Sequence, residues 1–174
     1  MIEIEVPSHA TASIEGDSVV LKGQKGASVK KFNRKFSNVS MENGRIRISE
    51  PVNKKILKQY APIETALANE IKKAFSDVEN GLEVKMKMVY SHFPMSLEIK
   101  NNEMIVKNLF GRKVARKARI LGQTKVLIKG QDITITGADS YDVGQTVANI
   151  RHSCKITKYD SRVFQDGIYI SREE

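Results

Sequence analysis

Two stretches of ten residues decide the fold: VSMENGRIRI at residues 39–48 and VLIKGQDITI at residues 126–135. Each has strand-forming apolar residues on both sides of a Gly-containing turn, a pattern that predicts a β-hairpin. A second matched pair, VVLK at residues 19–22 and MIVK at residues 104–107, precedes them in the same order. The separations, 87 and 85 positions, are almost equal. The chain is therefore expected to contain one structural unit twice.

One helix is expected to follow the strands of each unit. In the first unit, apolar residues recur at helical spacing, namely Ile63, Leu67, Ile71, Ala74 and Val78. Pro62 fits the first turn of that helix, where its missing N–H costs nothing. Residues 54–60 are expected to form a separate short helical turn.

The second helix is expected to begin after Gly137. Asp139 can accept a hydrogen bond as its N-cap residue, and Asp142 favours the positive end of the helix dipole. Apolar positions follow at spacings of 4, 3 and 4 residues, at Val143, Val147, Ile150 and Cys154. The spacing predicts that this side of the helix, Cys154 included, packs into a core.

Strand-like segments fill most of the remaining sequence, at residues 82–90, 96–100, 103–108, 125–129 and 132–136. Residues 162–165 and 168–171 form a candidate hairpin joined by Asp166 and Gly167. A run of strands followed by one helix favours an antiparallel sheet covered on one face. We therefore predict an α+β fold of two similar tandem domains, residues 1–80 and 81–174. Each is a mainly antiparallel sheet packed with one α-helix, and the second carries the hairpin.

The composition excludes several classes of protein. The single cysteine excludes an intrachain disulfide and a cysteine-based zinc site, and it fits a reducing compartment. The start, MIEIEV, lacks the basic residues and apolar run of a signal peptide. No apolar stretch approaches about 18 residues, so no membrane partner is expected. With 29 Lys and Arg against 20 Asp and Glu, the formal net charge is +9, which favours an anionic partner.

Much of the positive charge lies in two segments without any acidic residue. Residues 22–35 contain Lys22, Lys25, Lys30, Lys31, Arg34 and Lys35, and residues 107–119 contain Lys107, Arg112, Lys113, Arg116, Lys117 and Arg119. Residues 1–80 carry a net charge of +3 and residues 81–174 one of +6. Two hypotheses fit this pattern. The segments bind a nucleic-acid backbone through counterion release, or they are solvated strand faces whose lysines protect a sheet edge.

Known nucleic-acid modules and enzyme motifs do not fit the chain. Gly23 and Gly26 have the spacing of a KH loop, but that loop joins two helices, whereas strand-like residues flank it here. The aromatic pattern of an RRM is missing. Phosphate-binding, dinucleotide and hydrolase motifs are absent from the sequence, so neither a cofactor nor a small-molecule substrate is expected. His92 precedes Phe93 and Pro94; it is interpreted as a linker histidine with a structural hydrogen bond rather than as a catalytic base.

Four strings, taken together and in this order, resemble a known family. They are YSHFPM at residues 90–95, KNLFGRK at 107–113, GQT at 144–146 and RVFQDGIYI at 162–170. The chain looks like a member of the large-subunit ribosomal protein L-six family, in its archaeal and eukaryotic form, over essentially its whole length. The Lys- and Gly-rich tail of bacterial members is missing, which supports the archaeal or eukaryotic branch.

The resemblance implies a duplicated α+β fold and a structural, non-catalytic constituent of the large ribosomal subunit in the cytoplasm. Family members sit beside the sarcin–ricin loop, near the place where translational GTPases dock. They bind rRNA chiefly through the second domain, here residues 81–174. The implied partners are large-subunit rRNA and neighbouring large-subunit ribosomal proteins.

Carried onto this sequence, the RNA contacts fall on the turn at residues 108–113, its basic continuation to residue 119 and the C-terminal segment. We expect Gly111 to let the backbone approach the RNA. Relatives often have Glu where this chain has Arg112, which raises the local positive charge. The predicted RNA-binding residues are Lys107, Asn108, Gly111, Arg112, Lys113, Arg116, Lys117 and Arg119, with Lys155, Lys158 and Arg162 as secondary contacts. If about six phosphates are engaged, log K falls with log salt with a slope of roughly 4 to 5.

Two alternatives stay open on the residues themselves. One is an RNA-processing enzyme, for which His92 would lie in a cleft with a perturbed pKa and a carboxylate partner. The other is a non-ribosomal tandem module that binds proteins and whose charge is incidental.

Overall fold

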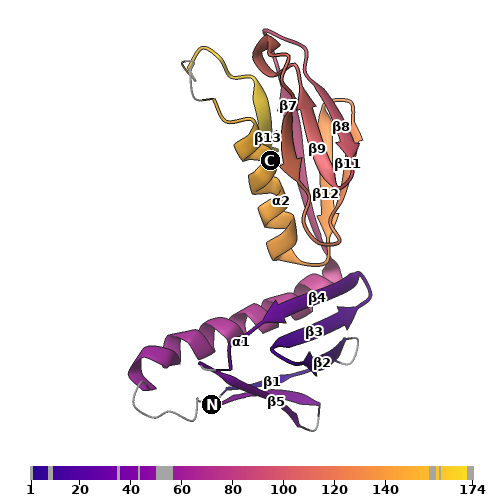
Figure 1. Ribbon diagram of the computed structural model, residues 1–174. Helices are drawn as coiled ribbons and strands as arrows, with labels where there is room; N and C mark the ends of the chain where they lie inside the picture. Colours follow the sequence, from indigo (N-terminus) through magenta and orange to yellow (C-terminus); the bar gives the residue numbers. More distant parts are fainter. Residues whose placement is uncertain are drawn as a thin grey trace. The chain divides into compact units, whose positions relative to one another are not determined.

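The computed structural model describes residues 2–7, 10–34, 36–42, 44–49, 57–156, 160 and 162–171, without the side chains of residues 57–61. The chain divides into two compact units, Met1–Gly81 and Leu82–Glu174, which we call unit 1 and unit 2 (Figure 1). Each unit contains antiparallel strands and one α-helix, so the predicted α+β class is confirmed.

Unit 1 has two three-stranded antiparallel sheets and the helix α1 (Leu57–Asn80). The first sheet has the order β1-β6-β5, formed by β1 (Ile2–Glu5), β6 (Arg45–Ser49) and β5 (Asn38–Glu42). The second has the order β2-β3-β4, formed by β2 (Thr11–Glu15), β3 (Ser18–Gly23) and β4 (Gly26–Lys31). Helix α1 packs against strands of both sheets, β1 and β6 in one and β3 and β4 in the other.

Unit 2 repeats this arrangement and adds one strand. A four-stranded sheet has the order β11-β12-β7-β13, formed by β11 (Lys125–Lys129), β12 (Asp132–Gly137), β7 (Leu82–Val89) and β13 (Gly167–Ile170). A three-stranded sheet has the order β10-β9-β8, formed by β10 (Arg116–Arg119), β9 (Glu103–Lys107) and β8 (Ser96–Lys100). Helix α2 (Ser140–Ser153) contacts strands of both sheets, including β10 and β12.

The matched sequences occupy matched places. Residues 39–48 lie in the hairpin β5-β6 and residues 126–135 in the hairpin β11-β12. The pair at residues 19–22 and 104–107 lies in β3 and β9, each the central strand of its three-stranded sheet. The flanking pairings correspond as well, since β1 pairs with β6 as β7 pairs with β12. The two units therefore share one strand order, as the internal duplication predicts.

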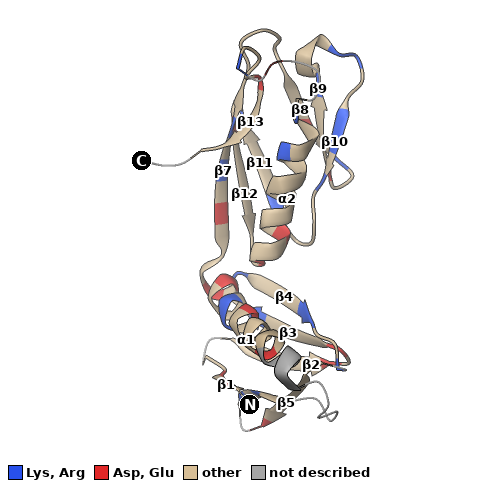
Figure 2. Cartoon of the chain, turned by 90° about the vertical axis from the view of Figure 1, so that its left-hand side faces the viewer, with Lys and Arg blue, Asp and Glu red and all other residues tan. Residues whose placement is uncertain are grey.

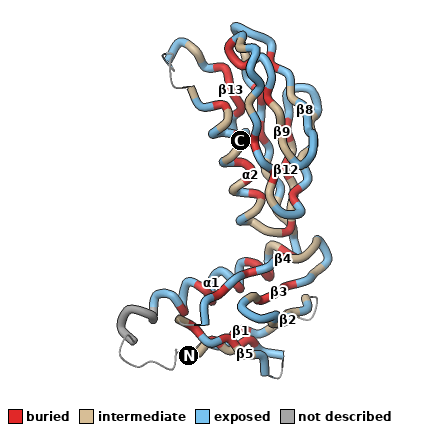
Figure 3. The backbone as a smooth tube through the Cα atoms, viewed as in Figure 1, coloured by how far each residue is buried: buried red, intermediate tan, exposed pale blue. Residues whose placement is uncertain are grey.

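The period of the apolar residues determines which side of each element is buried (Figure 3). In β6, Ile46 and Ile48 are fully buried, while Arg45 and Arg47 alternate with them on the other face. In α2, Val143, Val147 and Ile150 are buried as predicted, and so is Cys154 at its C-cap. Burial also raises the pKa of the Cys154 thiol, as expected for a packed cysteine.

The sequence predicted the start of α2 correctly but not the start of α1. Asp139 caps α2, because its side chain accepts a hydrogen bond from the backbone N–H of Tyr141 at 2.9 Å, which confirms the prediction. Helix α1 instead begins at Leu57, so Pro62 lies in its second turn and the predicted boundary at Pro62 is wrong. Residues 57–60 belong to α1 itself, and residues 54–56 lie outside the described residues.

The start of α1 also departs from the predicted apolar face. Ile63 is exposed, whereas Leu67, Ile71, Ala74 and Val78 are buried against the sheets. One missing hydrogen bond at Pro62 is tolerated because the stability of a helix in a protein comes mainly from the packing of its apolar face, here further along α1.

The predicted C-terminal hairpin is not formed. Residues 162–165 are turn and coil, and β13 pairs with β7 instead, with Ile168 opposite Met88. This pairing buries Ile168, while Asp166 is a buried residue rather than an exposed turn residue. Pairing with the edge of β7 gives β13 both backbone hydrogen bonds and an apolar surface to pack on. An isolated hairpin with its turn at Asp166 would provide only the hydrogen bonds, and such hairpins are marginally stable.

Candidate nucleic-acid interface

The turn between β9 and β10 has a defined backbone shape. Asn108 and Phe110 have left-handed φ angles of 58° and 55°, and Gly111 has φ +69°, within the short 3-10 turn η2 (Leu109–Gly111) and its cap. Leu109 and Phe110 are buried in the core of unit 2, and the Asn108 Nδ2 group donates to the carbonyl oxygen of Pro94 at 2.8 Å. The buried side chains and this hydrogen bond thus fix the turn on the core of unit 2. Arg112 and the exposed Lys113 follow directly after it.

The shape of the turn itself requires glycine at position 111. Its left-handed φ favours glycine, and a Cβ atom at this position would lie 3.2 Å from the Cε1 atom of Phe93. The N–H groups of Gly111 and Arg112 donate to the carbonyl oxygens of Asn108 and Leu109 at 3.3 and 3.2 Å. Because both N–H groups are already bonded, side-chain cations rather than these amides would meet a phosphate.

Arg116 is directed toward α2. Its Nη1 group donates to the carbonyl oxygens of Ser153 and Lys155 at 2.7 and 3.0 Å. These carbonyls lie at the C-terminal end of α2, where the helix dipole is negative and cations are favoured. Arg116, predicted as a phosphate contact, therefore joins β10 to the end of the helix.

The acid-free basic segment meets acidic residues from neighbouring strands. Lys107 lies 2.6 Å from the carboxylate of Glu98 on β8, and Lys117 lies 3.3 Å from that of Glu103 on β9. The hydrogen bond and positive charge of Lys107 lower the pKa of Glu98. Two of the six cations of residues 107–119 are therefore in ion pairs at the surface.

Lys113 and Arg119 remain as exposed cations. Neither has an ion-pair partner or side-chain hydrogen-bond partner in the part of the chain that the structure describes. The carbonyl oxygen of Arg119 accepts from the Asn149 Nδ2 group at 3.0 Å, which ties the end of β10 to α2. Figure 2 shows Lys and Arg in blue along β10 and in the loop that leads to it. This loop and strand, residues 112–119, form what we call the basic edge of unit 2.

Of the secondary contacts, Lys155 lies just beyond the C-terminal end of α2, the end that Arg116 also contacts. Lys155 is exposed and lines a hollow of about 440 Å³ together with Arg151, His152 and Tyr169. Tyr169 was not predicted here, because its strand was expected in a hairpin rather than beside β7. Arg162 is exposed in the turn before β13, and Lys158 lies outside the described residues.

His92 makes structural contacts. Its Nδ1 atom lies 3.0 Å from the Ser91 hydroxyl and 3.4 Å from the Oδ1 atom of Asp166. Its ring centroid lies 4.8 Å from that of Phe164, with the two rings tilted by 37°. Asp166 is only 1% exposed and also accepts from the Ser91 N–H at 2.9 Å. A carboxylate partner is thus present, but the His92 side chain is 38% exposed rather than enclosed in a cleft. The structural hydrogen bond expected of His92 is thus present.

In unit 1 the corresponding basic segment is also partly neutralised. Lys30 is buried beside Glu70, at 3.6 Å, and Arg34 pairs with Asp17 at 2.7 Å; Lys35 lies outside the described residues. Gly23 and Gly26 join two strands, as expected, so this turn is not a KH loop. The turn packs on the end of α1, because the Lys25 N–H donates to the carbonyl oxygen of Val78 at 3.1 Å.

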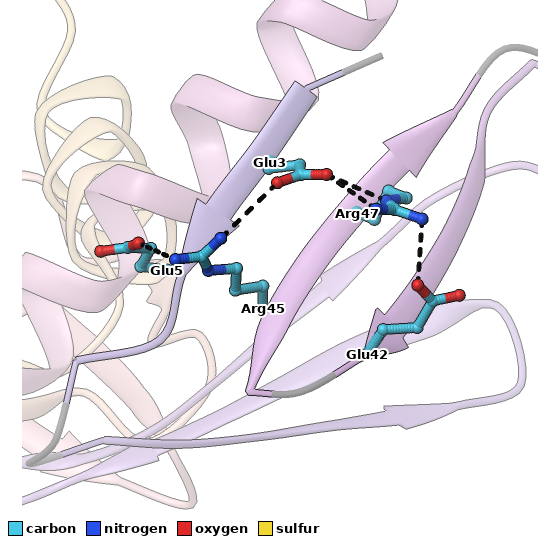
Figure 4. A network of polar contacts seen from close by, with 5 residues as sticks. All are labelled: Glu3, Glu5, Glu42, Arg45 and Arg47. Atoms are coloured by element: carbon cyan, nitrogen blue, oxygen red, sulfur yellow. Dashed lines mark hydrogen bonds and ion pairs between the residues drawn. The ribbon is translucent and has the colours of Figure 1, made fainter.

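The exposed face of the sheet β1-β6-β5 carries a network of ion pairs (Figure 4). Arg45 contacts Glu5 at 2.7 Å, and Arg47 contacts Glu3 at 2.9 Å and Glu42 at 3.0 Å. A hydrogen bond to Glu3 and the charges of Glu42 and Glu3 raise the pKa of Arg47. Since three glutamates surround two arginines, this face of unit 1 is no cationic surface.

No helix in the described part of the chain is both long and apolar enough to cross a membrane. Among the same residues, no group of three His, Cys, Asp or Glu side chains could hold a metal ion.

Comparisons with known proteins agree with this organisation. The family model described as ribosomal protein L6 matches residues 93–167, all within unit 2. The large ribosomal subunit protein uL6 of Methanocella arvoryzae is 38% identical over 170 residues, which cover 97% of this chain and 94% of the relative. The uL6 protein of Sulfurisphaera tokodaii is 38% identical, with 99% and 91% covered, and that of Archaeoglobus fulgidus is 38% identical, with 98% and 88% covered.

These relatives extend over nearly the full length of both chains, so the likeness covers both units and not only the matched segment of unit 2. The chain therefore belongs to the uL6 family of large-subunit ribosomal proteins, a family of structural proteins without enzymatic activity.

Proposed function

We propose that the protein binds large-subunit rRNA through unit 2, and that the basic edge is the principal contact. The family places the protein in the large ribosomal subunit, whose rRNA and neighbouring proteins supply its partners. The finer location is beside the sarcin–ricin loop, near the docking region of translational GTPases, on ribosomes of the cytoplasm. In this proposal unit 2 corresponds to the predicted RNA-binding domain, residues 81–174.

The observation that carries the proposal is the pair of exposed cations on the basic edge, Lys113 and Arg119, which have no partner among the described residues. Such side chains can neutralise phosphates without first breaking an internal ion pair. Lys107 and Lys117 must exchange a carboxylate for a phosphate, and Arg116 must leave the end of α2. Arg112 is half-buried beside Lys113 and adds to the positive potential.

Because some cations of the basic edge already have partners within the protein, the expected salt dependence of RNA binding changes. If Arg112, Lys113 and Arg119 are the main phosphate contacts of the edge, about three counterions are released there. The slope of log K against log salt is then about 2 to 3 for the edge, rather than the 4 to 5 expected for six contacts. Lys155 and Arg162 can add to this slope if the RNA extends past the C-terminal end of α2.

The test is binding of the full chain to an rRNA fragment that contains the sarcin–ricin loop, measured over a range of salt concentrations. The double variant Lys113→Glu, Arg119→Glu should bind at least about tenfold more weakly, and its salt slope should be lower by about 2. The control Lys125→Glu, Lys129→Glu makes the same charge change on exposed lysines of β11. An equal loss of affinity in both variants, or a flat salt response, would contradict the proposal and favour a protein-binding role.

A further inference from the structure

An exposed aromatic ring stands beside the basic edge. Phe93 lies in the loop between β7 and β8, and 42% of it is exposed. One edge of the ring faces Gly111, because a Cβ atom at Gly111 would lie 3.2 to 3.5 Å from three atoms of the ring. Arg112 and Lys113 follow Gly111 directly, so the ring and the cations come from the same surface of the unit.

The loop around Phe93 is held in place from both sides. On one side, the N–H and hydroxyl groups of Ser91 donate to the buried carboxylate of Asp166 at 2.9 and 3.2 Å. On the other, the carbonyl oxygen of Pro94 accepts from the Asn108 side chain, and Met95 is buried in the core. A ring on such a loop is pre-organised, which lowers the entropic cost of binding a partner.

The core of unit 2 does not need this ring. Phe110 belongs to that core and Phe164 packs against it, and their rings meet edge to face with centroids 6.2 Å apart. Phe93 is not part of that cluster, and no other aromatic ring of the described residues pairs with it. An exposed aromatic outside the core, next to cations, is the combination with which proteins hold single-stranded nucleic acid.

We propose that Phe93 is a stacking platform for one unpaired nucleobase of the bound RNA, with Arg112 and Lys113 next to the adjoining phosphates. The inference rests on the proposed rRNA binding and adds a contact of a different kind. The cations neutralise the backbone of any RNA, whereas the ring selects a site where a base is turned out of its helix. Every nucleobase has a face that can stack, so the contact recognises an unpaired base rather than a particular sequence.

The test uses two substitutions at position 93 and the same rRNA fragment. Phe93→Leu keeps an apolar side chain but removes the aromatic face, and it should weaken binding about 5- to 100-fold. The salt slope should stay unchanged, because stacking releases no counterions. Phe93→Trp should retain the affinity. Leu127→Val, at the 56% exposed Leu127 of β11, outside the basic edge, is the control and should bind as the unchanged protein does.

The tryptophan variant also reports the contact directly. The chain contains no tryptophan, so Phe93→Trp introduces a single fluorophore. Stacking on a nucleobase should quench its emission when RNA is added, whereas the emission of Leu127→Trp, on β11, should change much less. Unquenched emission at saturation, or unchanged binding by Phe93→Leu, would overturn the stacking proposal.

The failure of this inference can be distinguished from failure of rRNA binding itself. If Lys113→Glu weakens binding and Phe93→Leu does not, the rRNA proposal stands and the stacking proposal is wrong. If no variant alters binding and the salt response is flat, both are wrong. Equal losses for Phe93→Leu and Phe93→Trp would show that the loop needs the shape of phenylalanine, which also contradicts stacking.

Discussion

The guanidinium group of Arg116 donates from Nη1 to the carbonyl oxygen of Ser153, the last residue of α2, at 2.7 Å. The same nitrogen donates to the carbonyl oxygen of Lys155 at 3.0 Å. One side chain in a basic segment thus satisfies the last carbonyl group of α2, which has no partner within the helix, and a second carbonyl group just beyond the helix. Arg116, which the sequence suggests as an RNA contact, therefore stabilises the fold by joining β10 to the end of α2.

Replacing Arg116 with Ala should lower the stability of the protein by about 1 to 3 kcal/mol, since hydrogen bonds to a charged donor are lost and the two carbonyls must be solvated. Arg119→Ala is the matched control, because Arg119 is exposed on the same strand and should change stability by less than about 0.5 kcal/mol. Urea unfolding of both variants measures the difference. Equal stabilities would mean that Arg116 does not support the end of α2.

Gly111→Ala should destabilise the protein by about 1 to 2 kcal/mol. The alanine would have to adopt the left-handed φ of Gly111, which is unfavourable for a residue with a Cβ atom, and that atom would lie 3.2 Å from the ring of Phe93. Gly144→Ala gives the opposite expectation. Gly144 lies exposed in α2 with no atom within 4 Å of an added Cβ, so alanine should stabilise that helix by about 0.5 to 1 kcal/mol. Thermal unfolding of the two variants should shift in opposite directions.

Asp166 should make stability depend on acid pH. Burial alone would raise its pKa, but hydrogen bonds from Ser91 and His92 outweigh burial, and its pKa lies below the ordinary value of 3.8. The charged form is thus favoured in the folded state. The stability that the charged Asp166 contributes to the folded protein is fully present above about pH 4. It is lost as the pH falls through the lower pKa that Asp166 has in the folded state.

Asp166→Asn should therefore be less stable than the unchanged protein at pH 6, and the difference should shrink as the pH is lowered toward 2.5. Urea midpoints across this range measure the effect. Asp132→Asn, which changes an exposed carboxylate on β12, is the control and should leave the pH profile close to that of the unchanged protein. A constant difference between Asp166→Asn and the unchanged protein at all pH values would contradict the prediction.

Neutralising the carboxylates beside the basic edge should strengthen RNA binding. Glu98→Gln and Glu103→Gln release Lys107 and Lys117 from their ion pairs and remove two charges that repel phosphates. We expect the double variant to bind the rRNA fragment severalfold more tightly and with a salt slope steeper by about 1 to 2. Its stability should change little, because exposed ion pairs contribute little. Tighter binding without a steeper slope would show that Lys107 and Lys117 do not reach the RNA.

The elements of this protein follow closely from local sequence. The hairpins at residues 39–48 and 126–135, the buried face of α2 and the capping role of Asp139 were all predictable, because periodicity and capping depend on neighbours in the chain. The two departures, at Pro62 and at the C-terminal strand, arise where distant packing outweighs local preference. Neither the apolar surface along α1 nor the free edge of β7 can be deduced from the residues at those two places.

The sequence by itself determined that the fold is duplicated, that positive charge is concentrated in residues 107–119 and, through the four strings, the family. Only the tertiary structure decided which cations are available. Strand register puts Glu98 opposite Ile105 and Glu103 opposite Arg119, so that Lys107 and Lys117 reach these two carboxylates diagonally across the strands. The packing of α2 on β10 engages Arg116. The fold also brings Phe93 next to Gly111. The physical reason is that charge is a property of each residue, whereas pairing depends on distances between residues that the chain brings together only by folding.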